Sequence, residues 1–412
     1  MNQKPKNKKL YFIILAIVAA VVVVGVLFVR GDFNFVPNNT SGIKNPIEEK
    51  QTDNNQVDNK QTVSADFVDA NIKDPAGQLV RHLFNIESVP SPKGAVFSPD
   101  GKEIWTTMLL NKTRGVSVFS AITGKKIKDI NLENGGGVEA VFSFDGKKVY
   151  VSQMETARVF EIDAATKEIT RVFDTKSAWT KVLELAKDGK KIYASNWSGN
   201  DVSEIDLVAG KLIRRIPTVK TPRGLYTTED GKYLYVAGFD KGEIQKIDLS
   251  TGKGEIIYKN EGAMRHFVAD ESKNVLYISD MANAAIFTLN LSTNEVKKFA
   301  DTDVNPNTIA LSPDKKILFV SCRGTNYSDT NYYVPGPDWG SVLLFDTETG
   351  KMLDAIVGGN QPTALAVSND GTRLVFSDFL DNRLEVFGIP SYDILKNGNG
   401  GRSGVYKQDL KK

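Results

Sequence analysis

A unit of about 40–50 residues recurs along the chain, and Pro222–Lys253 is its clearest copy. This copy contains three strand-length runs rich in β-branched and aromatic residues, with Asp-Gly and Thr-Gly pairs at their ends. Such pairs supply the positive φ angle that a tight reversal needs. Each unit therefore predicts a small up-and-down antiparallel sheet.

Seven copies align on the turn residue that precedes the second strand. This residue is aspartate in six copies: Asp100, Asp145, Asp188, Asp230, Ser272, Asp314 and Asp370. The residue after it is glycine in five copies. Five positions after the turn residue, six copies carry an aromatic side chain: Trp105, Tyr150, Tyr193, Tyr235, Tyr277, Phe319 and Val375. Because three linked positions match, we interpret the chain as seven units of one architecture.

This repeat predicts an all-β fold. One four-stranded sheet cannot bury both of its faces, whereas seven sheets arranged radially bury them against one another. The expected domain is a seven-bladed β-propeller of four-stranded antiparallel blades over residues 76–390. The sixth unit carries about fourteen extra residues between its second and third strands, because its next anchor residue is displaced by that length.

A closed propeller needs a strand that joins its last blade to its first. Leu83 and Ile86 precede the first unit at the spacing that outer-strand residues have before later units. We therefore expect Leu79–Ile86 to complete the seventh blade beside Arg383–Phe387. The alternative is that Tyr392–Leu395 completes this blade and the earlier segment only covers it.

Several stretches resemble a known repeat family. The segments FSPDGKEIW, DGKYLYVAG and IDLSTGK are similar to the YVTN-type repeats of bacterial and archaeal surface-layer propellers, and the resemblance covers Leu79–Pro390. It implies a seven-bladed propeller. The broader group includes lactonase-like and cofactor-bearing propellers, so the resemblance does not by itself choose an activity.

The segments outside the propeller predict a membrane protein. Leu10–Val29 is twenty residues without a charge, enough for a helix of about 30 Å, the hydrocarbon thickness of a bilayer. Four lysines in residues 1–9 predict a cytoplasmic basic tail and a single-pass protein with its propeller on the cell surface. The alternative is a cleaved signal peptide, whose apolar region should be shorter. Residues 30–75 and 391–412 are expected to be a disordered linker and a flexible tail.

Each unit also contributes one residue near the start of its first strand, seven positions before the turn residue. These residues are Lys93, Val138, Lys181, Arg223, Arg265, Asn307 and Thr363. Ring symmetry predicts that the four cations among them converge at the mouth of the central channel, where they would bind an anionic group. The alternative is that they are ordinary repeat residues with solvated side chains.

The insert Arg323–Gly340 adds a second set of candidate binding residues. Its aromatic side chains are Tyr327, Tyr332, Tyr333 and Trp339. Exposed aromatic side chains on a loop favour recognition of sugar rings or of a partner surface. The alternative is a packed lid over the channel. Trp197 and Phe379 stand in the matching loops of other blades and extend the same predicted surface.

The sequence offers few catalytic groups. His82 and His266 are its two histidines, which argues against a histidine-rich metal site, and no motif predicts a cofactor. A lactonase-like hydrolase is the alternative activity, with His266 as base, Glu139 orienting it and arginines binding the substrate. A net charge of +2 does not indicate nucleic-acid binding. The single cysteine, Cys322, excludes an intrachain disulfide and is expected to be packed in the core.

The favoured function is that of a membrane-anchored, surface-displayed binding or scaffold module. The expected ligand is an anionic envelope glycan or a partner protein, bound by the cationic residues and the aromatic insert together. The expected form is a monomeric propeller.

Overall fold

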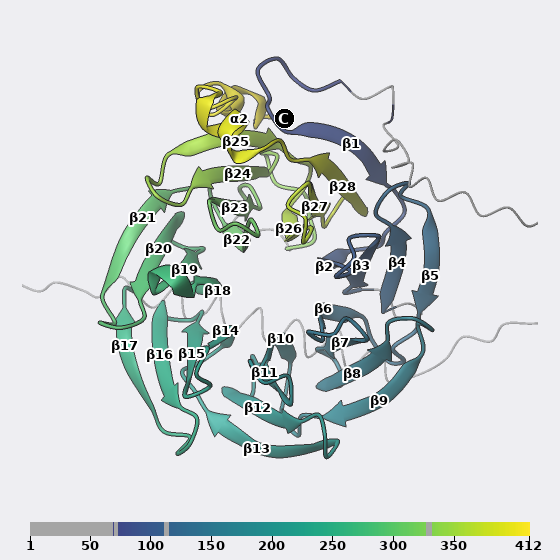
Figure 1. Ribbon diagram of the computed structural model, residues 1–412, viewed down its shortest axis with the longest axis vertical. Coiled ribbons are helices and arrows are strands. Elements are labelled where there is room, and N and C mark those ends of the chain that lie inside the picture. The colour runs from purple at the N-terminus through teal and green to yellow at the C-terminus, as the bar shows by residue number, and fades with distance from the viewer. Residues whose placement is uncertain (1–68, 70–72, 111–114, 327–331) are drawn as a thin grey trace, which may run out of the picture. The chain divides into compact units, whose positions relative to one another are not determined.

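The computed structural model describes residues 69, 73–110, 115–326 and 332–412. In this part of the chain, seven four-stranded antiparallel sheets surround a central channel, which confirms the predicted propeller (Figure 1). The predicted membrane span Leu10–Val29, the basic tail and most of the linker lie outside the described residues. Among those that are described, no helix has the length and apolar character needed to cross a bilayer.

The strands follow one another from the channel outward in every blade. Blades one to four consist of β2 (Pro92–Phe97), β3 (Glu103–Met108), β4 (Val116–Ser120) and β5 (Lys126–Ile130); β6 (Gly137–Phe142), β7 (Lys148–Gln153), β8 (Arg158–Asp163) and β9 (Ile169–Asp174); β10 (Thr180–Leu185), β11 (Lys191–Asn196), β12 (Asp201–Asp206) and β13 (Lys211–Pro217); and β14 (Pro222–Thr227), β15 (Tyr233–Gly238), β16 (Glu243–Asp248) and β17 (Gly254–Lys259).

The remaining blades have the same order, and the seventh uses a strand from the start of the domain. They consist of β18 (Met264–Asp270), β19 (Val275–Asp280), β20 (Ala285–Asn290) and β21 (Val296–Asp301); β22 (Pro306–Leu311), β23 (Ile317–Cys322), β24 (Ser341–Asp346) and β25 (Met352–Val357); and β26 (Pro362–Val367), β27 (Arg373–Asp378), β28 (Arg383–Gly388) and β1 (Arg81–Ile86). A short 3₁₀ helix, η1 (Glu271–Lys273), replaces the Asp-Gly turn of the fifth blade.

The repeated aromatic position lies in the second strand of each blade and packs between neighbouring blades. Trp105, Tyr235 and Phe319 are completely buried there. The turn glycines do what the sequence predicts: Gly231, for example, has a φ of 66°. Burial of a large aromatic side chain at this position in six blades, and of Val375 in the seventh, stabilises the packing between blades.

Strand β1 closes the ring as predicted. It pairs antiparallel with β28, so that Arg81 faces Gly388 and Ile86 faces Leu384. The alternative closing segment is instead part of a helix, α2 (Tyr392–Asn397). Blade seven therefore combines three strands from the end of the domain with one from its beginning.

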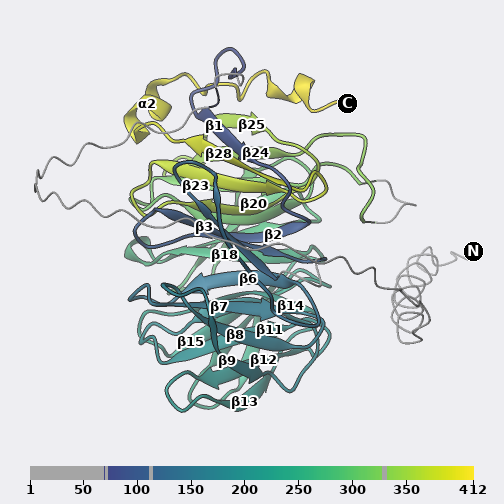
Figure 2. The ribbon, with the colours of Figure 1, turned by 90° about the vertical axis from the view of Figure 1, so that its right-hand side faces the viewer.

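The expectation of a flexible C-terminal tail is wrong. Helix α2 and the 3₁₀ helix η2 (Tyr406–Asp409) lie along the outer strand β25, at the same edge of the propeller in both ribbon views (Figures 1 and 2). The Asp354 carboxylate on β25 accepts hydrogen bonds from the backbone N–H groups of Leu79, Val80 and Arg402. One buried carboxylate thus ties both ends of the domain to the sixth blade.

The sixth-blade insert lies between β23 and β24, as predicted. Cys322 ends β23 and is fully buried, in agreement with a packed role, and burial raises the pKa of its thiol. A buried thiol with a raised pKa is a poor nucleophile.

Candidate functional site

The first strand of every blade is bulged where it reaches the channel mouth. Its pairing register with the second strand shifts close to the first strand's start in all seven blades. A bulge interrupts the alternation of side chains across a strand. As a result adjacent residues, such as Val138 with Glu139 and Arg265 with His266, line the same cavity.

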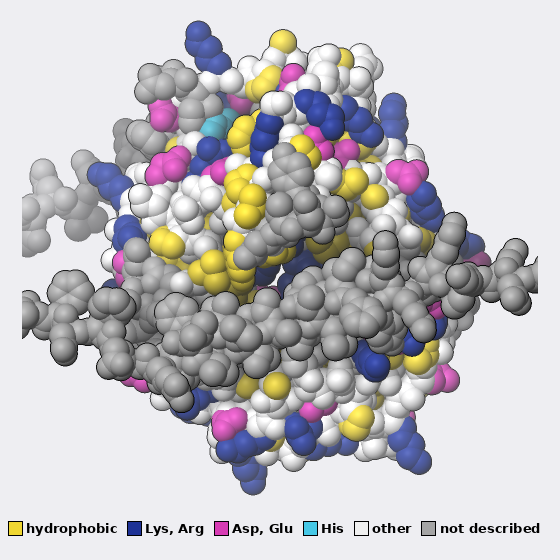
Figure 3. Space-filling model, turned by 180° about the vertical axis from the view of Figure 1, so that it is seen from behind, with side chains coloured by type: hydrophobic (Ala, Val, Ile, Leu, Met, Phe, Trp, Pro, Cys, Tyr) yellow, Lys and Arg dark blue, Asp and Glu magenta, His cyan; other side chains and the backbone are white. Residues whose placement is uncertain are grey.

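The cations predicted to surround the mouth do converge: Arg223 and Arg265 are buried, and Lys93 and Lys181 are half-buried. Arg223 and Arg265 are only 7% and 6% exposed. Burial lowers the pKa of Lys93 well below its ordinary value, and the charges of Arg323, Arg265, Arg223 and Lys181 lower it further. Such burial contradicts the alternative of solvated repeat residues. In Figure 3, cationic side chains lie in the central hollow and hydrophobic side chains border it.

A fifth cation, Arg323, joins them from the start of the insert. It is 3% exposed, and burial together with the charge of Arg223 lowers its pKa to about 9. Burial likewise lowers the pKa of Arg223 to about 10 and the pKa of Lys181 well below its ordinary value. These five side chains, called here the cation cluster, are Lys93, Lys181, Arg223, Arg265 and Arg323.

In the described part of the chain, no carboxylate forms an ion pair with a member of the cation cluster. The polar partners that these side chains have are neutral. Arg265 donates from Nε to Asn307 Oδ1, and Arg323 donates from Nη2 to Gln361 Oε1 over 2.7 Å. Neutral acceptors satisfy hydrogen bonds but leave the positive charge uncompensated.

Aromatic rings take the place that counter-ions usually occupy. The Lys181 ammonium lies 3.9 Å from the centre of the Trp197 ring, and the Arg223 guanidinium lies 5.8 Å from the same ring. The Arg323 guanidinium lies 4.2 Å from the centre of the Tyr332 ring. Each contact stabilises a cation by about 0.5–2 kcal/mol without neutralising it. The positive potential of the cluster is therefore retained.

The insert packs Tyr332 and Tyr333 against the mouth. Tyr332 lies 5.2 Å from Tyr333 and 5.8 Å from Phe379 between ring centres, and its hydroxyl accepts a 3.3 Å hydrogen bond from Lys93 Nζ. Tyr333 remains 44% exposed, so the insert combines packed and exposed rings. Trp339 does not share these contacts. The centre of its ring lies 4.5 Å from Nζ of Lys412, in the C-terminal segment. Tyr327 lies outside the described residues.

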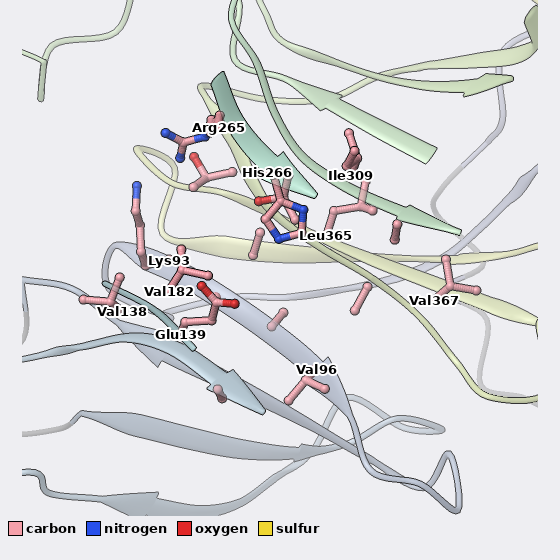
Figure 4. Close-up of a pocket in the computed structure, with 18 of the residues that line it drawn as sticks. Lys93, Val96, Val138, Glu139, Val182, Arg265, His266, Ile309, Leu365 and Val367 are labelled. Carbon is pink, nitrogen blue, oxygen red and sulfur yellow. The ribbon is translucent and has the colours of Figure 1, made fainter. Parts of the chain in front are cut away.

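A cavity of about 280 Å³ extends from the cation cluster into the channel. Glu139 and His266 project into it from opposite sides (Figure 4). Burial raises the pKa of Glu139 to about 8, so its carboxyl group is protonated at neutral pH. Burial and the charges of Arg265 and Arg223 lower the pKa of His266 to about 3, so its imidazole is neutral. No carboxylate charge of Glu139 therefore compensates the cation cluster at neutral pH.

Three buried polar atoms at this site have no hydrogen-bond partner among the residues that the structure describes. They are His266 Nδ1, Asn307 Nδ2 and Arg323 Nε. Buried polar groups are almost always hydrogen-bonded, and an orphaned one costs about 1–3 kcal/mol. The N–H groups of Asn307 and Arg323 and the Nδ1 atom of His266 could therefore form hydrogen bonds to a bound molecule.

The sequence analysis missed Arg323 although the repeat contains a signal for it. Nine positions after the turn residue, each unit has one residue just after its second strand: Leu109, Met154, Trp197, Phe239, Met281, Arg323 and Phe379. Arg323 is the one charged residue in this series. An alignment of the seven units at this position shows that Arg323, Trp197 and Phe379 occupy equivalent places in their blades.

Comparison with known proteins supports the fold and leaves the family open. No family model matches the chain, so the YVTN-type assignment remains a resemblance. A 93-residue stretch, 23% of the chain, is 46% identical to Antigen Lp49 of Leptospira interrogans. The match spans 20% of that protein's length. Kuenenia stuttgartiensis hydrazine synthase is similar in structure, with a TM-score of 0.62, over 73% of this chain and 96% of that chain. At 18% sequence identity this second likeness concerns the fold alone.

Proposed function

We propose that this protein is a binding module that takes an anionic ligand at the channel mouth. The observation that carries the proposal is the cation cluster: five mutually repelling cations, three of them arginines at most 7% exposed, without a carboxylate partner among the described residues. Removing charges from water without pairing them is costly. A bound anion would offset this cost.

The proposed ligand is an anionic envelope glycan or the acidic surface of a partner protein. Lys93, Lys181, Arg223 and Arg265 would bind its charges, and the exposed ring of Tyr333 would add contact area. The likeness of part of the chain to a protein described as an antigen is in keeping with display at the cell surface. The propeller would act as a monomer.

Removing two arginines from the cluster should abolish this binding. For the full chain carrying Arg223→Ala and Arg265→Ala, we expect affinity for anionic cell-wall polymer to fall at least about a hundredfold, since each charge-assisted contact contributes about 1.5–3 kcal/mol and two are lost. Binding of the native chain should weaken as salt is raised. Retention on immobilised polymer at several salt concentrations measures both effects.

The matched control removes two cations from the opposite face, where Lys125 and Lys190 are exposed in turns. Lys125→Ala with Lys190→Ala should leave retention unchanged. Equal losses in the two double variants would mean that net charge governs retention, and the proposed site would be wrong.

We propose binding in preference to catalysis. In a lactonase-like hydrolase, His266 would act as the base, but a pKa of about 3 makes a weak base. Glu139, protonated at neutral pH, is better suited to donate a hydrogen bond than to orient that base. Turnover of a lactone or ester that disappears in His266→Ala would contradict the binding proposal.

For the topology we propose a single Leu10–Val29 anchor with the basic tail in the cytoplasm and the propeller outside. Protease added to intact cells should then release a propeller-sized fragment by cutting within residues 31–72. Immunoblotting of cells and medium measures the release. A propeller that resists protease until the membrane is permeabilised would place it in the cytoplasm.

A further inference from the structure

From the two ends of the channel cavity we infer that the ligand is a small amphipathic anion. Its multivalent oxyanion head, a phosphate or paired carboxylates, binds the cation cluster, and its compact apolar body fills the cavity beneath. This inference rests on the proposed function and narrows its ligand from any anionic surface to a molecule that enters the channel.

The cavity has a charged end and an apolar end. In Figure 4, Lys93 and Arg265 lie at one end, Val96 and Val367 lie at the other, and Glu139 and His266 lie between them. The last residues of β2, β22 and β26 build the apolar end, and those that line the cavity include Val96, Ala310, Leu311, Ala366 and Val367. An inorganic anion would leave this surface in contact with water. An apolar body attached to the anion would cover it.

The head group is expected to carry at least two negative charges. Five cations influence one another's pKa values across the mouth, and one monovalent anion would leave most of that repulsion in place. Arginine guanidinium groups match the oxygen spacing of phosphates and carboxylates. The Arg323 Nε and Asn307 Nδ2 atoms have no partner among the described residues and are further donors within the cation cluster or beside it.

The middle of the cavity suits an uncharged polar linkage between head and body. Glu139 is protonated and offers an O–H donor, and His266 is neutral with its Nδ1 atom unpartnered. An ester oxygen or a hydroxyl group would bond to these two residues without adding charge.

The size of the cavity favours one compact molecule. Its volume of about 280 Å³ stands at the lower end of the roughly 300–1,000 Å³ of ligand pockets. A glycan lying across the face would contact the mouth without filling the apolar end.

Calorimetric titration of the full chain in detergent with four probes tests this inference: inorganic phosphate, phenyl phosphate, long-chain polyphosphate and phthalate. Phenyl phosphate should bind about tenfold or more tightly than inorganic phosphate, because its ring is buried against the apolar end. The affinity of long-chain polyphosphate, counted per phosphate group, should not exceed the affinity of phenyl phosphate. Phthalate, which carries two carboxylates on the same ring, distinguishes a phosphate head from a dicarboxylate head.

A larger side chain at the apolar end of the cavity gives a variant that tests the apolar contact alone. Ala366→Leu should reduce the affinity for phenyl phosphate to that for inorganic phosphate and leave inorganic phosphate unchanged. Ala310→Leu, on a different strand, should do the same and replaces the first variant if that one does not fold. Arg265→Ala should weaken all probes, because it removes the head-group contact.

The outcomes separate this inference from the function on which it rests. Equal affinities for phosphate and phenyl phosphate, or an unchanged preference in both leucine variants, would overturn the amphipathic ligand while the anion site stands. Tight binding of polyphosphate alone would point to a polymer on the face and would also overturn it. Failure of every anion, polymer included, would reject the proposed function itself.

Discussion

Deleting residues 76–88 from the full chain should abolish the cooperative unfolding of the propeller or lower its melting temperature by more than about 15 °C. The deletion removes β1, whose Leu83, Phe84 and Ile86 side chains are almost completely buried. Burial of three such side chains contributes roughly 5–9 kcal/mol, which approaches the entire stability of an ordinary domain. Calorimetry and near-UV circular dichroism measure the effect.

A deletion of the same length within the predicted linker, residues 45–57, is the control and should leave the melting temperature unchanged. The two deletions shorten the chain equally, so a difference between them reports the strand itself. If both variants melt like the native protein, strand β1 does not close the ring and the register between β1 and β28 has no energetic role.

Glu139→Gln should stabilise the protein at pH 8 by roughly 2–4 kcal/mol and have almost no effect at pH 4. In the unfolded chain this carboxyl group ionises near pH 4.5, whereas burial raises its pKa in the folded protein to about 8. Folding therefore keeps a proton that the unfolded state loses, and native stability falls as pH rises from about 4.5 to about 8. Glutamine carries no proton to lose, so this pH dependence disappears. Urea unfolding across that range measures it.

Glu161 provides a control, because replacing it with glutamine should change the stability at pH 8 in the opposite direction. Burial alone would raise its pKa, but hydrogen bonds from Arg171 and Thr170 lower it below the ordinary value. Its stabilising contribution is present above pH 4.5 and is lost as pH falls through the lowered pKa. Glu161→Gln should therefore destabilise the protein at pH 8. A Glu139→Gln variant that is less stable than native at pH 8 would show that Glu139 is ionised in the folded protein.

The C-terminal segment shows why composition misled the sequence analysis. Its run of Asn, Gly and Ser residues is typical of a disordered tail. The segment is nevertheless packed, because Leu395 and Tyr406 contact apolar side chains of the sixth blade. The backbone N–H of Arg402 also donates a hydrogen bond to the Asp354 carboxylate. These partners lie far away in the sequence, and short-range patterns carry no information about them.

The cation positions were predictable, whereas their environment was not. Ring symmetry placed Lys93, Lys181, Arg223 and Arg265 at one mouth from the repeat alone. Their burial depends on bulges in the first strands and on rings from other blades: Trp197 lies against Arg223, and Tyr332 lies against Lys93. A repeat alignment treats each unit alone, and these contacts form between units.

The sequence by itself determined the number of blades, the closing strand, the place of the insert and the residues that meet at the channel mouth. These features follow from short-range turn chemistry and from a period that repeats seven times. Only the tertiary structure decided that the arginines of the cluster are buried, that no described carboxylate pairs with the cluster, and that a protonated Glu139 and a neutral His266 line one cavity. The physical reason is that a charge's solvation and its partners depend on every chain segment within a few ångströms, and in a ring those segments come from blades hundreds of residues apart.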